Sequence, residues 1–339
     1  MKKINILILS LLCIVNFALS LFAKQIEDKR QFNEIIAFGD SLTDVGNVAE
    51  LTEPGFAPLI FGYYGKTHFS DNLIWIEVLA NYWGLSARIP GRGVSTTLQP
   101  NVFGNTWAWG GSKAANGAVK SNGVTEPIPN LLITIDQYLA SNKPNRQTLY
   151  ALWSGADSFI IGDKFGPNAA KMAANAVGKA IVRLDGAGAR HILVFNMPRL
   201  GDTPGAQAGG KAIIMSANTY TFFYNKELMR ALKEVVGNKD FKANIYLVDV
   251  YSEFERIVNT VKHGEDYMPN FFVPGSAVVI NNVSDQGLHY FQIEGLKPQN
   301  YLFWDALHPT YEGHQVLAAL VIQSLQPLKI KDLQKKRPK

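Results

Sequence analysis

The chain is almost free of cysteine: Cys13 is the one cysteine among its 339 residues. It lies in the uncharged run 4–23, which follows two lysines and offers small-residue cleavage sites after Ser20 and after Ala23. This pattern predicts a secretory signal peptide over residues 1–23. Its removal would leave no cysteine, which excludes disulfides and a thiol nucleophile from the mature protein. An uncleaved N-terminal anchor is the alternative, because the run approaches the length of a membrane span.

Motifs of several other enzyme classes are missing as well. The chain has no Gly-x-Ser-x-Gly, no His-Glu-x-x-His and no Walker loop, which argues against the nucleophile elbow, zinc site and phosphate loop that those motifs build. The histidines at positions 68, 191, 263, 289 and 314 show no paired ligand spacing, so we expect no metal and no cofactor. The formal net charge is +5, and +3 without residues 1–23. Such a mild excess does not indicate a nucleic-acid partner.

The chain does have ample apolar sequence for a core, with 47% hydrophobic and 18% charged residues. It contains no proline- or serine-rich linker, no internal repeat and no low-complexity block, so we predict a single domain over residues 24–328. Residues 329–339 form a basic tail. A solvated chain end is the favoured interpretation of this tail, and a membrane-docking patch is the alternative.

Strand patterns alternate with helix patterns along the chain. Continuous apolar runs predict strands buried on both faces, and these are Glu34–Phe38, Thr106–Trp109, Thr148–Trp153, Arg190–Asn196 and Asn244–Val250. Apolar spacing predicts helices, and these are Asp71–Trp83 with a capping residue at its start, Asn168–Asp185, Ser216–Val236 and Thr310–Leu325. The alternation indicates an α/β fold with a doubly wound parallel sheet.

Ser41 occupies the most informative position in the sequence. It stands in the block Phe38–Asn47, which reads Phe-Gly-Asp-Ser-Leu-Thr-Asp-Val-Gly-Asn, directly after the first predicted strand. A Gly-Asp-Ser turn that leaves a buried strand lifts the serine hydroxyl to the carboxyl end of the sheet, where open α/β folds place their chemistry. Ser41 is therefore a candidate nucleophile, provided that a base reaches it.

A candidate base precedes the last predicted helix, in the sequence Asp305-Ala306-Leu307-His308. His308 would take the proton of Ser41 as general base and return it to the leaving alcohol. Asp305 would bind the far ring nitrogen, fix the tautomer and stabilise the imidazolium. In isolation an Asp-x-x-His pattern is weak, because most matches to it are chance pairs at a surface.

The combination of blocks resembles the GDSL/SGNH family of esterases and lipases. Phe38–Asn47 is a close match to the opening block of that family. Further matching blocks follow in the family's order, and these are Phe69–Trp75, Trp107–Gly111, Trp153–Ser158, Asn196–Gly201 and Asp305–His308. The resemblance covers most of residues 33–325, and it is strongest to secreted bacterial lysophospholipases, phospholipases A and acyltransferases.

The resemblance implies a flavodoxin-like three-layer α/β/α sandwich with a central parallel sheet, and ester hydrolysis through an acyl-serine. Residue by residue, it implies Ser41 as nucleophile, Asp305 as orienting acid and His308 as base. It also implies an oxyanion hole made by the backbone N–H of Ser41, a backbone N–H of the glycine block and the side chain at position 157. Gly111 is the predicted backbone donor and Gly110 its alternative, since glycine lets a backbone approach a substrate closely.

Asp157 departs from the family pattern, which has asparagine at this place. An ionised carboxylate only accepts hydrogen bonds, and at about 4 Å from an oxyanion it would be repelled by roughly 4 kcal/mol at an effective dielectric constant near 20. Three accounts remain open: Asp157 is protonated and donates, it is turned away while Ser158 or a water substitutes, or hydrolysis is poor. We expect a working site, because loss of one donor costs only about a hundred- to thousandfold in rate.

Three features favour a lipid ester as the substrate. They are the predicted export, the aromatic stretches Phe56–Tyr64 and Phe271–Val273, and the resemblance to lipid-cleaving family members. The expected reaction releases a fatty acid from a lysophospholipid or similar monoacyl ester, with a membrane surface as the expected setting and acyl transfer to an alcohol such as a sterol as an extension. A carbohydrate acetyl esterase and a catalytically weak binding module are the alternatives.

The stretch His263–Gln299 breaks the alternation of strands and helices. It holds three prolines and several aromatic residues, which argue against disorder. We interpret it as a packed excursion that walls the substrate cleft, and a plain surface extension is the alternative.

Overall fold

The structure is a computed structural model that describes residues 31–50, 68–87, 91, 104–115, 127–161, 166–262, 273–276, 278–284, 287–292 and 301–329. The predicted signal peptide, the aromatic stretch Phe56–Tyr64, Phe271, Phe272 and the tail beyond Lys329 lie outside these residues. None of the helices in the described ranges is both long and apolar enough to cross a membrane.

Four parallel strands form the central sheet in the order β1-β2-β3-β4. They are β1 (Glu34–Gly39), β2 (Thr148–Trp153), β3 (His191–Phe195) and β4 (Asn244–Val248). Each is a short apolar run whose side chains are buried on both faces of the sheet, as parallel strands require. These positions confirm four of the five predicted strands.

The predicted strand Thr106–Trp109 is wrong as an element, although its backbone runs beside β1. Trp107 donates its N–H to Ala37 O at 2.7 Å, but only an isolated parallel bridge forms there. The Nδ2 group of Asn47 donates to the carbonyls of Thr106 and Ala108 at 2.7 and 2.9 Å. A side chain therefore takes the place that a further strand would occupy.

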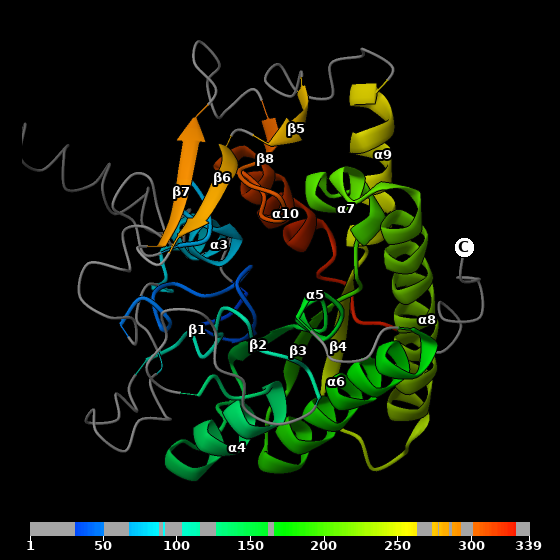
Figure 1. Cartoon of the computed structure of the whole chain (residues 1–339). Coiled ribbons are helices and arrows are strands. Elements are labelled where there is room, and N and C mark those ends of the chain that lie inside the picture. Colours follow the sequence, from blue (N-terminus) through cyan, green and yellow to red (C-terminus); the bar gives the residue numbers. More distant parts are fainter. Residues whose placement is uncertain are drawn as a thin grey trace, which may run out of the picture.

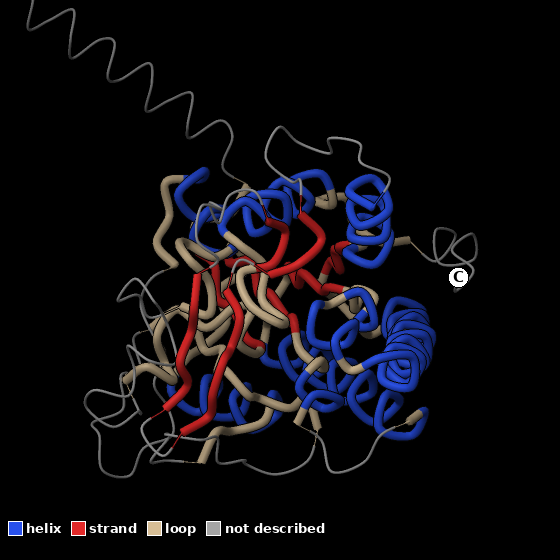
Figure 2. Tube along the Cα trace, turned by 45° about the horizontal axis from the view of Figure 1, so that its top comes forward, coloured by secondary structure: helices blue, strands red, loops and turns tan. Residues whose placement is uncertain are grey.

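Helices cover both faces of the sheet, which gives three layers (Figures 1 and 2). One face packs against α4 (Leu131–Ser141), α6 (Pro167–Ala187) and α8 (Gly210–Gly237). The other packs against α3 (Trp75–Trp83), α9 (Val250–Lys262) and α10 (Tyr311–Gln323). Neighbouring strand residues alternate between the two cores, as in Ile36 and Ala37, because side chains of a strand point to opposite faces. The predicted three-layer α/β/α fold is confirmed.

The helix predicted to begin at Ser216 begins at Gly210, and two other predicted element ends are wrong for a reason that a side chain explains. The Asp71 carboxylate does not cap α3; it accepts the Tyr311 N–H at the start of α10, at 2.7 Å. The α3 helix begins later, and Glu77 accepts the N–H of the N-cap residue Ile74 at 3.1 Å. The strand predicted to reach residue 250 ends at Val248, because the Asp249 carboxylate accepts the Ser252 N–H in the first turn of α9.

Short elements complete the carboxyl edge of the sheet. They are α5 (Asp157–Ile160), the 3₁₀-helix η1 (Leu200–Asp202) and α7 (Pro204–Ala208). Within the predicted excursion, β5 (Val273–Ser276) pairs with β8 (Tyr301–Phe303), and β6 (Val278–Ser284) pairs with β7 (Gly287–Gln292). The side chains of 261–300 are outside the described part, so their role as a cleft wall stays a prediction.

Candidate active site

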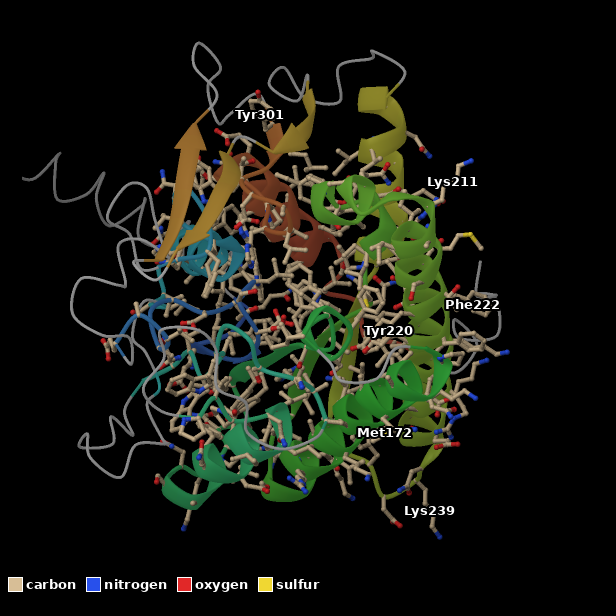
Figure 3. All side chains as sticks on the ribbon, in the orientation of Figure 1. Met172, Lys211, Tyr220, Phe222, Lys239 and Tyr301 are labelled. Carbon is tan, nitrogen blue, oxygen red and sulfur yellow. The ribbon has the colours of Figure 1, made fainter. Side chains whose placement is uncertain are left out.

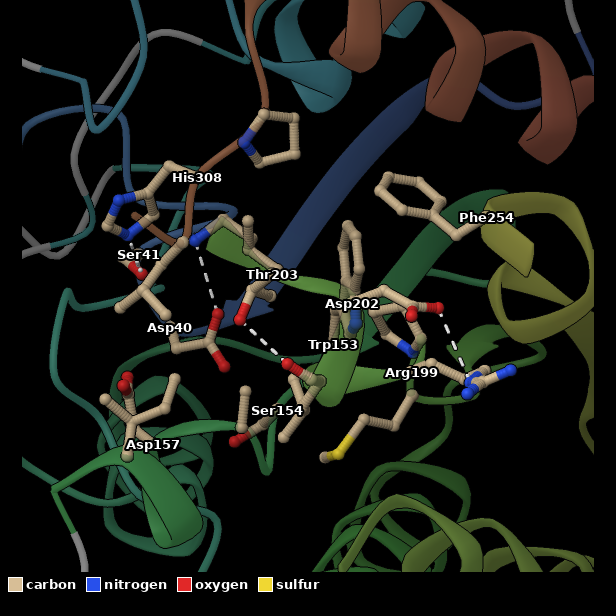
Figure 4. A pocket seen from close by; sticks show the side chains of 18 of the residues that line it. Asp40, Ser41, Trp153, Ser154, Asp157, Arg199, Asp202, Thr203, Phe254 and His308 are labelled. Atoms are coloured by element: carbon tan, nitrogen blue, oxygen red, sulfur yellow. Dashed lines mark hydrogen bonds and ion pairs between the residues drawn. The ribbon is translucent and has the colours of Figure 1, made fainter. Parts of the chain in front are cut away.

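Ser41, His308 and Asp305 meet at the carboxyl edge of the sheet. Ser41 follows the end of β1, while the other two residues lie in the loop between β8 and α10. His308 Nε2 lies 2.8 Å from Ser41 Oγ, and His308 Nδ1 lies 2.7 Å from Asp305 Oδ2. The structure thus brings together the three residues that the sequence nominated, and Figure 4 shows Ser41 beside His308, which is 267 positions away in the chain.

The loop that carries His308 is fixed by Asp305 itself. Asp305 Oδ1 accepts the backbone N–H groups of Leu307 at 2.7 Å and of His308 at 2.8 Å. The N–H of Trp304 closes the turn on the carbonyl of His308 at 2.7 Å. One carboxylate therefore holds both the backbone and the ring of the histidine.

The charges of this pair support each other. Burial favours a neutral Asp305, but the neighbouring His308 and the two backbone donors outweigh it and lower the pKa of Asp305. Burial likewise opposes a charge on His308, but the charge and hydrogen bond of Asp305 outweigh it and raise the pKa of His308. Asp305 is therefore ionised at neutral pH, and it stabilises an imidazolium once His308 takes a proton.

Asp44 ties the serine loop to the glycine block, a role that the sequence did not reveal. Its carboxylate is buried and accepts backbone N–H groups from Gly46 at 2.8 Å, Asn47 at 2.7 Å and Val48 at 3.2 Å. A fourth donor is the Gly110 N–H, 66 residues away, at 2.9 Å. Three of the four donors are local, but the sequence gives no sign of the fourth, which links the two segments.

The bond from Gly110 to Asp44 distinguishes the two candidate backbone donors of the glycine block. The Gly110 N–H is occupied by Asp44, whereas the Gly111 N–H lies near the carboxyl group of Asp157 and lowers the pKa of that acid. Gly111 has φ 81°, a left-handed conformation that favours glycine. Among hydrogen bonds between described residues, none uses the Ser41 N–H. Gly111 is thus the candidate backbone donor whose N–H is not used by Asp44, and Asp157 lines the same pocket as Ser41.

Asp157 is buried at the start of α5, and it lines the pocket with Ser41 and His308. Its Oδ2 has no hydrogen-bond partner among the described residues. Burial raises the pKa of Asp157 to about 6, against the charge of His308 and the nearby N–H of Gly111. Asp40, also buried with one such unpartnered oxygen, has its pKa raised by burial and by Asp157. A neutral acid at this place can donate a hydrogen bond, which an ionised one cannot.

Ser158, the predicted substitute for Asp157, is engaged elsewhere. Its Oγ accepts the N–H of Ala114 at 3.3 Å. Ser158 does not line the pocket. The account in which it replaces Asp157 in the oxyanion hole is therefore not supported by its contacts.

An apolar pocket opens beside Ser41. Its empty space is about 830 Å³ when the open space at its mouth is counted. Its apolar lining comes from the strand ends and from α9, and includes Trp153, Met197, Leu200, Phe254, Phe303 and Leu307. Across the pocket from Ser41, Arg199 forms ion pairs with Asp202 and Glu255 at 3.4 and 3.3 Å (Figure 4).

The described histidines other than His308 have structural partners. His68 Nε2 lies 2.8 Å from Glu77 Oε2, His191 Nδ1 lies 2.9 Å from the Tyr246 hydroxyl, and buried His314 accepts the N–H of Trp75. Burial lowers the pKa of His314 to about 3, so this ring is neutral. The described ranges hold no group of three or more side chains suited to bind a metal ion.

Comparison with known proteins decides the family. A family model described as GDSL-like lipase/acylhydrolase matches residues 35–321. The chain belongs to this family. The match confirms the family predicted from the sequence, and it assigns the chain to the carboxylic ester hydrolases at the level of the family.

Two bacterial relatives are similar over most of the chain. The thermolabile hemolysin of Vibrio parahaemolyticus is 24% identical over 87% of this chain, which spans 64% of that protein. The phosphatidylcholine-sterol acyltransferase of Aeromonas hydrophila is 24% identical over 88% of this chain and 92% of that protein. A crystal structure of a lipolytic G-D-S-L family member from Veillonella parvula covers 87% of this chain and 99% of that one, with 13% identity and a TM-score of 0.42.

Proposed function

We propose that the chain hydrolyses lipid esters through an acyl-Ser41 intermediate. His308 Nε2 takes the Ser41 proton as Oγ attacks the ester carbonyl, and the carbonyl oxygen becomes an oxyanion. When the tetrahedral intermediate collapses, the bond to the leaving alcohol breaks and His308 gives that alcohol its proton. A water activated by His308 then releases the fatty acid. The observation that carries this proposal is the unbroken hydrogen-bond chain from Ser41 to Asp305.

The proposed oxyanion hole consists of the Ser41 N–H, the Gly111 N–H and a protonated Asp157. The contact between Gly111 and the Asp157 carboxyl supports this grouping. The unpartnered Oδ2 of Asp157 supports the proton, because a buried carboxylate without a partner is costly to ionise. Protonation converts this oxygen from an acceptor that repels an oxyanion into a donor that stabilises it.

We infer a lysophospholipid or similar monoacyl ester as the substrate, met outside the cytoplasm after export. The apolar pocket beside Ser41 supports an acyl chain, and the run 4–23 supports export. The acyltransferase relative supports a second outcome, in which an alcohol such as a sterol replaces water as acceptor. In both cases the acyl group leaves Ser41 in the same way.

The deciding experiment measures fatty acid released from a defined lysophosphatidylcholine by the wild type and by Ser41→Ala. Release by the wild type alone is expected, and equal release by both proteins would overturn the proposal. Acetylated xylan in a parallel assay tests the acetyl esterase alternative, which faster acetate release would favour. Added cholesterol tests transfer, through formation of cholesteryl ester.

Asp157 favours one competing function, a binding module on a hydrolase scaffold, because an ionised acid here would oppose the oxyanion. A fluorophosphonate probe separates the two, since it labels only an activated serine. The proposal expects labelling of the wild type and none of Ser41→Ala. An unlabelled wild type with intact lipid binding would favour the binding module.

A further inference from the structure

The outer surface of α6 and α8 carries apolar side chains in water. Of the described large hydrophobic residues that are exposed, five lie on these two helices. On α8 they are Met215 and Phe222, exposed by 70% and 37%, and Ile213, exposed by 45%, which lies about 160° around the helix from Met215. On α6 they are Met172 and Val182, exposed by 49% and 54%. Scattered exposed apolar residues are ordinary, but a cluster on two packed helices indicates an interaction surface.

The outward stripe of α8 combines these side chains with lysines. Lys211, Met215, Phe222, Lys226 and Lys233 are all exposed and follow one another at spacings of 4, 7, 4 and 7. At about 100° per residue, these spacings keep all five within one narrow arc of the helix. Figure 3 shows Lys211 and Phe222 on the outer side of α8, while Tyr220, which is buried, points inward.

The surface is positive as well as apolar. The acids of α8, Glu227 and Glu234, both bind Arg230, and no ion pair between described residues involves the three lysines of the stripe. Exposed Lys171 and Lys179 on α6 extend the same charge. Lys226 Nζ lies 5.9 Å from the centre of the Phe222 ring, and Lys171 Nζ lies 5.9 Å from that of Phe223. Cations and apolar groups therefore lie next to one another on both helices.

We propose that the outer face of α6 and α8 docks the protein on an anionic lipid surface. Anionic headgroups match the lysines in charge, and the apolar side chains between them can enter the boundary between headgroups and acyl chains. The first half of α8 adjoins the substrate pocket, because Thr221 and Asn218 accept backbone N–H groups of η1, whose residues Leu200 and Asp202 line the pocket. Docking would hold the pocket close to its lipid source.

Vesicle co-sedimentation tests the docking face independently of catalysis. The probes are vesicles of ether-linked phosphatidylglycerol and of ether-linked phosphatidylcholine, which an ester hydrolase cannot cleave. The full chain is expected to bind the anionic vesicles, to bind the zwitterionic ones at least tenfold more weakly, and to be released by about 0.5 M salt. Equal binding to both vesicles, or to neither, would overturn the proposal whatever the outcome of the lipase assay.

Two variants and two matched controls locate the contact. Lys211→Gln/Lys226→Gln/Lys233→Gln removes three cations from the stripe, and Met215→Ser/Phe222→Ser removes its apolar groups. Each is expected to weaken binding at least tenfold with unchanged circular dichroism and thermal midpoint. The controls remove three exposed cations and one exposed aromatic elsewhere, and they are Lys143→Gln/Arg146→Gln/Lys239→Gln and Tyr82→Ser.

The outcomes assign the contact to one surface. Loss of binding in the stripe variants but not in the controls supports the proposal. Equal losses in variants and controls would show a general charge effect and overturn it. Residues 330–339 hold five more cations and one acid. If only their deletion abolished vesicle binding, the contact would be assigned to the tail and the proposal overturned. A further outcome would make the face a contact between copies of the chain. In that case the wild type would self-associate and not bind vesicles, and Met215→Ser/Phe222→Ser would abolish the self-association.

Discussion

The backbone N–H of Gly111 lies near enough to the carboxyl group of Asp157 to lower the pKa of that acid, so two members of the proposed oxyanion hole are neighbours in the free protein. An ionised Asp157 would keep this donor for itself and repel the developing oxyanion. A protonated Asp157 has a weaker hold on Gly111, and its second oxygen, which has no partner among the described residues, can carry a donating proton. The protonation state of one side chain thus controls two donors.

Asp157→Asn is expected to raise activity above neutral pH. With a pKa of about 6 for Asp157, about one molecule in a hundred keeps this proton at pH 8. The variant should therefore gain about a hundredfold in kcat/KM at pH 8, and little at pH 5. The acidic limb of the pH–rate profile of the variant should also move to lower pH. The Asp157 charge helps to raise the pKa of His308, and the variant lacks this charge. The measurement is kcat/KM from pH 5 to 9 for both proteins. An inactive variant at every pH would mean that the acid has another role.

The same substitution is expected to change how stability depends on pH. The folded protein holds the Asp157 proton up to about pH 6, whereas an unfolded aspartate loses it near pH 4. The wild type therefore loses stability as pH rises from about 4 to 6, by about 3 kcal/mol at 1.4 kcal/mol per pKa unit, relative to Asp157→Asn. Urea unfolding of both proteins at pH 4, 5, 6 and 7 measures the difference.

Asp305→Asn is the matched control for that trend, because the Asp305 charge changes stability with pH in the opposite direction. The pKa of Asp305 is lowered in the folded state, so the ionised form stabilises the fold above the unfolded pKa and loses this effect as pH falls. The wild type should exceed Asp305→Asn in stability at pH 7 and approach it in acid. Parallel curves for the two variants would contradict the assigned pKa directions.

Asp44→Asn is expected to lower both stability and rate. The carboxylate accepts four backbone N–H groups, and an asparagine would turn an NH₂ group towards some of them. Leaving buried donors unpaired costs about 3 kcal/mol in total, and the freed Gly110 would loosen the glycine block. Urea unfolding and the rate of fluorophosphonate labelling measure the two effects. The exposed Asp240→Asn should change neither, and a wild-type rate in Asp44→Asn would contradict the proposed link.

The hydrogen bond between Asp44 and Gly110 is an example of a contact that the sequence did not predict. The strand Thr148–Trp153 was predicted with its final bounds, because a continuous apolar run between polar residues is a local signal. Ser41 and His308 were nominated by blocks that each carry their own local pattern. The choice between Gly110 and Gly111 depends instead on a bond across 66 residues, and no local pattern encodes such a partner. The prediction of a strand at Thr106–Trp109 is wrong for the same reason, because the distant side chain of Asn47 binds carbonyl groups along its free edge.

Gly110→Ala is expected to reduce kcat through a steric route that leaves the Asp44 bond in place. A Cβ on Gly110 would lie 2.3 Å from the ring of Phe69, whose centre is 5.1 Å from that of the His308 ring. The displaced Phe69 would push His308 away from Ser41, and a misplacement of this kind costs about a hundredfold in rate. Steady-state kinetics on a soluble short-chain ester should show the loss in kcat with KM little changed.

A double substitution tests whether Phe69 transmits this effect. Phe69→Leu removes ring atoms that an alanine at position 110 would strike, so Gly110→Ala/Phe69→Leu should recover most of the activity of Phe69→Leu alone. The interaction energy of the cycle would then be favourable, as expected for residues in direct contact. A double variant no more active than Gly110→Ala would contradict transmission of the effect through Phe69.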